Sequence, residues 1–159
     1  MKVVSRMTAD VVSVTVDEDI TAAFELMSEG QFRHLPVTDR GLLVGIISDR
    51  DILLQAQGTK SNLTIPPVAV ADVMTKAPVT ISSGATLAEA ANLMLAHHID
   101  CLPVLGRDGD LVGIITSTDI MDVVTCTEET ETLLDSRPEE RRVEVLYYAP
   151  YVETGGASD

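Results

Sequence analysis

Two short segments of the chain place a hydroxyl and a carboxylate three residues apart, directly after a glycine and a pair of isoleucines. The first segment is GIISDRD (45–51) and the second is GIITSTD (113–119). At the start of a helix, a Ser or Thr followed three residues later by an acidic residue is typical of a capping box. Capping boxes more often use Glu or Gln, but an Asp is also favourable beside the positive end of the helix dipole. Helix capping alone therefore explains each segment when it is taken singly.

The same atoms also match the polar half of a nucleotide site. The free N–H groups at a helix N-terminus attract an anion, and a Ser or Thr hydroxyl there can donate to a phosphate. A carboxylate one turn later can accept hydrogen bonds from the two vicinal hydroxyls of a ribose. Because the pattern is written twice, this second interpretation predicts two related clefts.

An internal repeat explains why the pattern is doubled. The segment MTADVVSVTVDEDITAAFELM (7–27) aligns with MTKAPVTISSGATLAEAANLM (74–94) at an offset of 67, which extends to LPV at 35–37 and at 102–104. One extra residue in the next turn makes the offset 68, so that Asp51 aligns with Asp119. A near-constant offset over about 45 positions indicates a duplication.

Each copy predicts the order strand, helix, strand, strand, helix. Alternating valines at 12–16 favour a short first strand. Asp19 is the expected N-cap of the helix that follows in the first copy, and Thr86 with Glu89 forms a capping box in the second. Both helices carry one apolar stripe with i, i+3, i+4, i+7 spacing. The polar turns TDRG and GRDGD then separate two apolar strands, and the repeated segment leads into the second helix.

These elements predict an α+β fold of two modules. One copy is too small to cover its own sheet, so we expect the two copies to pack sheet to sheet. The segments KVVSRM and VAVADVM each lead into the module that follows them. The expected boundaries are residues 1–56 for the first module, 57–67 for a polar linker, 68–126 for the second module and 127–159 for an acidic C-terminal extension.

Composition narrows the function classes. Apolar residues make up 45% of the 159 residues and aromatic residues only 3%, with no Trp, which predicts an aliphatic core. A net charge of −14 argues against a nucleic-acid partner.

No apolar run is long enough for a membrane helix and the N-terminus has no signal-peptide core, so we expect a cytoplasmic protein. Cys101 and Cys126 lack metal-ligand or C-x-x-C spacing and are expected to be reduced structural thiols.

With its doubled M-T, L-P-V and G-I-I-[ST]-x-x-D motifs, the chain resembles a tandem pair of CBS domains, also called a Bateman module, over residues 1 to about 125. The resemblance implies two β-α-β-β-α modules related by a pseudo-twofold axis, and a homodimer. It also implies a regulatory sensor that binds an adenosine-containing ligand such as AMP, ADP, ATP or S-adenosylmethionine. We expect no fused effector domain, so the expected target is an unidentified protein partner acted on in trans.

The resemblance also implies two clefts, each between the Ser/Thr-x-x-Asp of one module and the first strand and pre-LPV segment of the other. The stronger nucleotide site comprises Thr116, Asp119, Val11, Phe32, Arg33, His34, Leu35 and Pro36. The weaker site comprises Ser48, Arg50, Asp51, Pro78, Ile99, Asp100, Cys101 and Leu102.

The two clefts are not expected to be equivalent. Asp100 and Cys101 take the places that Arg33 and His34 hold in the stronger site, where their basic groups suit a phosphate. A carboxylate repels a phosphate, although Arg50 is placed to compensate. We therefore expect the second cleft to bind weakly, to bind an uncharged adenosine moiety, or to be empty.

Catalysis and metal binding have little support in the sequence. The pair His97–His98 ends a helix, where histidine favours the dipole, and His34 has no Cys or Asp at ligand spacing, so no metal site is expected. Asp49, Asp51 and His34 have no nucleophile or oxyanion hole beside them, so we predict no catalytic residues and no required cofactor.

The C-terminal extension leaves a second hypothesis open. TEETETLLDSRPEERR (127–142) predicts an acidic helix ending at Pro138, and VEVLYYAPYV (143–152) predicts a strand. The last residues, ETGGASD, are typical of a frayed end. The extension either covers an edge of the fold or docks a partner. The alternative function is thus a nucleotide-independent protein-interaction module that docks through this tail or through the face of the disc-shaped dimer, and whose Ser/Thr-x-x-Asp segments are only helix caps.

Overall fold

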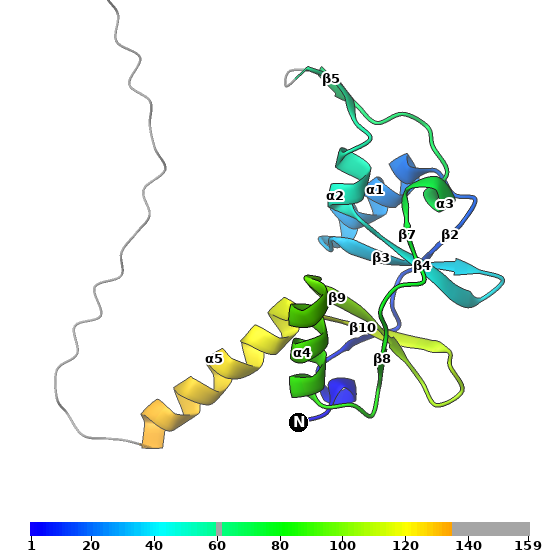
Figure 1. The fold of residues 1–159 in the computed structure, drawn as a ribbon. Coiled ribbons are helices and arrows are strands. Elements are labelled where there is room, and N and C mark those ends of the chain that lie inside the picture. Colours follow the sequence, from blue (N-terminus) through cyan, green and yellow to red (C-terminus); the bar gives the residue numbers. More distant parts are fainter. Residues whose placement is uncertain (60–61, 135–159) are drawn as a thin grey trace, which may run out of the picture.

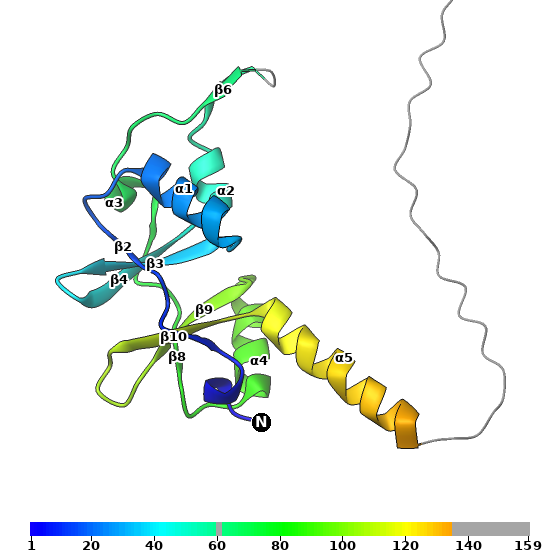
Figure 2. The same cartoon turned by 180° about the vertical axis from the view of Figure 1, so that it is seen from behind.

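Two sheets, one from each module, face one another between outer helices in the computed structural model (Figures 1 and 2). The structure describes residues 1–59 and 62–134. Elements before the linker are the 3-10 helix η1 (Val3–Ser5), β1 (Thr8–Ala9), β2 (Val14–Thr15), α1 (Ile20–Gly30), β3 (His34–Asp39), β4 (Leu42–Ser48) and α2 (Asp49–Leu53). Later elements are β5 (Gln57–Thr59), β6 (Asn62–Thr64), α3 (Val70–Val73), β7 (Thr75–Lys76), β8 (Ile81–Ser82), α4 (Leu87–His97), β9 (Cys101–Leu105), β10 (Leu111–Thr116) and α5 (Ser117–Leu134). The α+β fold of two related modules is confirmed.

Local sequence signals position the outer helices. The carboxylate of Asp19 accepts a hydrogen bond from Thr21 N at 2.7 Å and caps α1. Thr86 and Glu89 form the expected capping box of α4. The helix α4 ends at His97, as the sequence predicts. The helix between the first two strands of each module core therefore begins at a side-chain cap.

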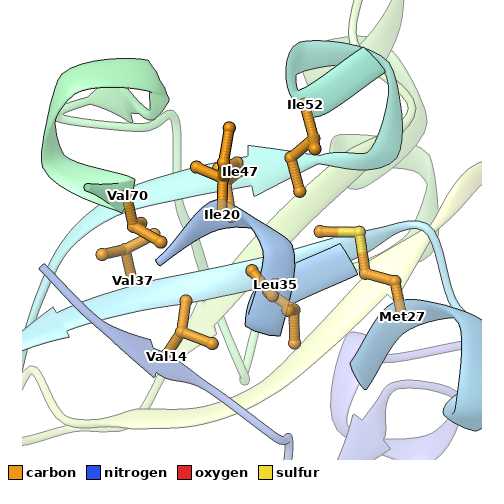
Figure 3. Close-up of a cluster of buried hydrophobic side chains, with 9 residues drawn as sticks. Val14, Ile20, Met27, Leu35, Val37, Ile47, Ile52 and Val70 are labelled. Carbon is orange, nitrogen blue, oxygen red and sulfur yellow. The ribbon is translucent and has the colours of Figure 1, made fainter. Parts of the chain in front are cut away.

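Each module has its own aliphatic core. Figure 3 shows the first, in which side chains from α1, α2, α3, β2, β3 and β4 converge. Its buried members are Val14, Ile20, Ala23, Met27, Leu35, Val37, Ile47, Ile52 and Val70. The second core consists of Val3, Ile81, Leu87, Ala90, Met94, Leu102, Val104 and Ile115. The aliphatic interior predicted from composition is thus present twice.

The leader segments exchange between the modules. In the first sheet the strand order is β2-β3-β4-β7, and in the second it is β1-β10-β9-β8. The strand β1 therefore pairs with β10 of the second module, and β7 pairs with β4 of the first. Val3 and Val70, which precede these strands, are fully buried in the core of the opposite module. Sequence patterns alone did not predict this exchange.

The exchange explains the glycine that opens each repeated segment. Gly113 pairs with Ala9 of β1, and Gly45 pairs with Lys76 of β7. A Cβ at Gly113 would lie 2.7 Å from Met7 Sδ and 2.8 Å from the carbonyl oxygen of Thr8. The leader strand therefore crosses so closely that it leaves no room for a side chain at this position.

Substitution of Gly113 by alanine is expected to lower the free energy of unfolding by about 1–3 kcal/mol, because the added methyl meets backbone that cannot move freely. Gly84→Ala is the matched control, since the nearest heavy atom to its Cβ would be Ser82 Oγ at 3.8 Å. Urea unfolding of both variants measures the difference. Equal stability of the two variants would contradict the close crossing.

Three regions differ from the sequence-based expectations. The first strand is shorter than the alternating valines suggest, and Val12 is 48% exposed. Residues 57–64 of the expected linker contain the antiparallel pair β5–β6. The expected acidic helix is, as far as Leu134, a continuation of α5, while the rest of it, the strand at 143–152 and the terminal segment lie outside the described residues. Among the described helices, none is both long and apolar enough to cross a membrane.

Candidate functional site

The two Ser/Thr-x-x-Asp segments are capping arrangements at the junctions of β10 with α5 and of β4 with α2. Asp119 Oδ2 accepts hydrogen bonds from Thr116 N at 2.7 Å and Thr116 Oγ1 at 2.8 Å. Asp51 Oδ2 likewise accepts from Ser48 N at 2.9 Å and Ser48 Oγ at 2.7 Å. The return bonds from the backbone N–H of each Asp to the hydroxyl are 3.4 and 3.2 Å long. The capping interpretation is confirmed for both segments, so the question is what else these side chains face.

Two adjoining cavities, of about 220 and 390 Å³, lie beside Thr116 and Asp119. We call them together the Asp119 cleft. The first is lined by Thr8, Asp10, Val11, Val12, Phe32, Arg33, His34, Ile114, Thr116 and Asp119. The second is lined by Gln31, Phe32, Arg33, His34, Asp100, Thr116, Ser117, Thr118 and Asp119. The cleft therefore brings the end of β10 in one module against the segment before β3 and the turn before β2 in the other.

A cavity of about 340 Å³ lies beside Ser48 and Asp51. This Asp51 cleft is lined by His34, Ile46, Ser48, Asp51, Thr75, Ala77, Pro78, Val79, His98, Ile99, Asp100, Cys101 and Pro103. It joins the end of β4 to the segment before β9 and the turn before β8. The structure thus brings together the central residues of each predicted site.

The repeat relates the two clefts residue by residue. At offsets of 67 before the hairpin and 68 after it, each of the ten residues lining the smaller cavity of the Asp119 cleft has a counterpart lining the Asp51 cleft. The lining residues that sequence reasoning missed include Thr8 with Thr75, and Ile46 with Ile114. Extending the repeat alignment to β1 and β7, and along β4 and β10, could have found them. The turn residues Asp10 and Ala77 both have positive φ, 52° and 48°, so the backbone conformation is also repeated.

Four predicted site residues lie away from the described cavities. Leu35 and Leu102 are fully buried in the two cores, because side chains alternate along a strand and their neighbours His34 and Cys101 face the clefts. Pro36 is also fully buried. Arg50 is exposed on α2 and, in the described residues, lines neither cleft.

His34 and Asp100 each line both clefts, so the two sites share a wall. Burial lowers the pKa of His34 below its usual 6.5, although the carboxylates of Asp49, Asp100 and Asp51 act in the opposite direction. A pKa below 6.5 leaves the imidazole mostly neutral at pH 7, so it supplies less positive charge than the sequence suggested. Asp100, expected only in the weaker site, adds a carboxylate to the stronger one as well.

Cys101 contributes a neutral thiol to the Asp51 cleft. Burial, reinforced by the charges of Asp119 and Asp100, raises its pKa to about 12, so the thiolate that would act as a nucleophile is nearly absent at neutral pH. The thiol is free. Among the described residues, no three His, Cys, Asp or Glu side chains converge to hold a metal ion. Both clefts therefore offer apolar surface, hydroxyls, carboxylates and the His34 imidazole, and the Asp119 cleft also has Arg33 in its lining.

One ion pair borders the Asp119 cleft. Arg33 Nε lies 3.2 Å from Asp49 Oδ2, and the side chain of Arg33 is 75% exposed while that of Asp49 is 28% exposed. Arg33 lines both cavities of the cleft. Arg33 thus borders the cleft, and the charge of its guanidinium is partly balanced by the Asp49 carboxylate.

Comparison with known sequences identifies a repeated domain. The family model described as the CBS domain matches residues 3–58 and 70–130. A CBS domain-containing protein of Dictyostelium discoideum is 31% identical over 134 residues, covering 78% of this chain and 92% of that protein. The inosine-5′-monophosphate dehydrogenase of Korarchaeum cryptofilum is 33% identical over 111 residues, but the match covers only 22% of that enzyme.

Solved structures agree with this match. The complex of CBSX2 with AMP has a TM-score of 0.68 and 26% identity, covering 80% of this chain and 99% of that chain; CBSX2 is a CBS-pair protein of Arabidopsis thaliana. The CBS domain pair of protein MJ0100, in complex with 5′-methylthioadenosine and S-adenosyl-L-methionine, has a TM-score of 0.68 and 25% identity, covering 80% of this chain and 98% of that chain. Both relatives hold adenosine-containing ligands.

Proposed function

This chain belongs to the CBS domain family and carries two copies of the domain in tandem, and from that premise we propose that it is a regulatory module that binds an adenosine-containing ligand. Ligands of this class are present in the structures of the CBS pairs CBSX2 and MJ0100. The chain spans less than a quarter of the matched dehydrogenase, so the chemistry of that enzyme has no support in this chain. The proposed output is a change in a protein partner.

The observation that carries the proposal is the surroundings of the Thr116–Asp119 cap. Val11, Phe32 and Ile114 line the same cavity as this cap, so an apolar slot for a base adjoins a carboxylate suited to a ribose. Within the described part of the chain the cap uses Asp119 Oδ2, which leaves Oδ1 to accept from a ribose hydroxyl. Helix capping alone would not require an apolar cavity beside Thr116 and Asp119.

We assign the stronger binding to the Asp119 cleft. Its described lining includes Arg33 beside three Asp, whereas the described lining of the Asp51 cleft includes two Asp and neither Lys nor Arg. A phosphate in the Asp51 cleft would face Asp100 without a cation to offset it. The Asp51 cleft therefore favours an adenosine group without a phosphate, or stays empty.

The regulatory part of the proposal concerns assembly. The proposed protein is a homodimer that acts in trans on a protein partner and carries out no catalysis, as its membership of the CBS domain family suggests. Ligand binding would favour one arrangement of the two modules, since a ligand between them contacts both.

Isothermal titration calorimetry of the full chain with AMP, ADP, ATP and S-adenosylmethionine tests the proposal. We expect saturable binding of at least one of these ligands below millimolar concentration. Failure of all four to bind at millimolar concentration would contradict it. In that case, a partner captured without nucleotide and lost on deletion of 127–159 would support the alternative function as a nucleotide-independent interaction module.

A further inference from the structure

The junction of β4 with α2 matches that of β10 with α5, except that the first has an ion pair between Arg33 and Asp49. At the equivalent positions the second module has Asp100 and Ser117, which cannot form an ion pair. Both junctions share the same backbone bond, from Asp49 N to Arg33 O at 3.0 Å and from Ser117 N to Asp100 O at 2.9 Å. The side-chain pair is therefore added to a backbone arrangement that forms without it.

Asp49 is the better fixed member of the pair. Its Oδ1 accepts a hydrogen bond from Arg50 N at 2.8 Å, and its Oδ2 faces Arg33 Nε. Its side chain is 28% exposed, against 75% for Arg33. The carboxylate therefore determines where the guanidinium lies. Because the contact uses Nε, the terminal nitrogens of Arg33 can still donate to one phosphate.

The charges around the Asp119 cleft are unfavourable for a polyphosphate. Of the described residues that line it, Arg33 alone is a Lys or Arg, while Asp10, Asp100 and Asp119 contribute carboxylates. His34 adds little positive charge at pH 7, because burial lowers its pKa below 6.5. Each phosphate beyond the first thus adds negative charge beside a single cation that is already paired.

We propose that Asp49 is a positioning residue that makes the Asp119 cleft favour adenosine ligands carrying at most one phosphate over ADP and ATP, an inference that rests on the proposed function. It acts through Arg33, whose charge it balances and whose position it fixes. AMP and uncharged 5′-methylthioadenosine therefore bind more tightly than ADP, and ADP binds more tightly than ATP.

Calorimetry on the full-length Asp49→Ser variant tests this assignment, since Ser117 already stands at the matching position of the second module. The variant loses a carboxylate and releases Arg33, so the affinity for ATP is expected to rise about three- to fivefold. The affinity for 5′-methylthioadenosine, which has no phosphate, is expected to stay unchanged. Asp49→Glu should restore the original order of affinities. Asp108→Ser, in the exposed β9–β10 turn, controls for the change in net charge.

The possible outcomes distinguish failure of the proposed function from failure of the role assigned to Asp49. If the wild-type protein binds none of the ligands, the proposed function fails and this inference fails with it. If 5′-methylthioadenosine binds normally but the ratio of ATP to AMP affinity in Asp49→Ser equals that of the wild type, this inference alone is overturned. An equal rise in affinity for ATP and 5′-methylthioadenosine would also overturn it, because that result indicates a general change in the cleft.

Discussion

Replacing Asp119 with alanine is expected to weaken adenosine-ligand binding about 10- to 100-fold, the loss typical of hydrogen bonds to a charged group. The carboxylate is proposed to accept from the ribose, and no other carboxylate stands at its place in the cap of α5. Calorimetry with AMP and with 5′-methylthioadenosine measures the effect. Both ligands should lose affinity to a similar extent, because the ribose is common to them.

Asp51→Ala is the matched control, since it removes the equivalent cap at the start of α2. Loss of either cap is expected to cost about 1 kcal/mol of stability, so a structural effect alone would appear equally in both variants. We expect Asp51→Ala to leave the tighter binding event within about twofold of the wild type, which is small on the scale of a hydrogen bond to a charged group. The reverse order of effects would refute the assignment of the stronger site to the Asp119 cleft.

Substitution of Val3 by aspartate is expected to destabilise the protein by about 4 kcal/mol, because it places an unpaired carboxylate in an aliphatic core. The adjacent residue provides the control. Val3 is fully buried and Val4 is 53% exposed, so Val4→Asp should change the free energy of unfolding by no more than about 0.5 kcal/mol. Urea unfolding of the two variants compares them directly.

The strands that lose hydrogen-exchange protection in Val3→Asp show whether the N-terminal segment packs on the second module or on the first. Val3 lies in the second core, with Leu102 and Ile115. Hydrogen exchange in Val3→Asp should therefore lose protection first at β9 and β10, although residue 3 is far from both in sequence. Loss of protection confined to β3 and β4 would show that the leader packs on the module that follows it.

Much of the fold follows from the repeat because periodicity and capping are local signals. Asp19 caps α1, and the pair Thr86 and Glu89 caps α4, where the sequence predicts these helices to begin. The central site residues were also predictable, because the Ser/Thr-x-x-Asp segments end strands that face the other module. The assignment of every residue to a ligand role remains a prediction.

The remaining features depend on contacts between segments that are distant in sequence. Nothing local to Val3 or Val70 indicates which sheet the leader joins, since both segments are simply short and apolar. The neutral state of His34 depends on burial between the modules, which a residue pattern does not contain. The side chains of Leu35 and Leu102 lie in the cores, because consecutive strand residues alternate between core and cleft.

Because the segments that lead into the two modules are exchanged, each repeat needs the other to complete its sheet. A recombination breakpoint within 57–67 would divide the gene where the repeats divide. The first half would nevertheless lose β7 from its sheet and carry β1 away from β10. We expect rearrangements that transfer one repeat alone to be selected against, whereas those that move both repeats together keep each sheet complete. The unit that evolution can reuse is therefore the pair.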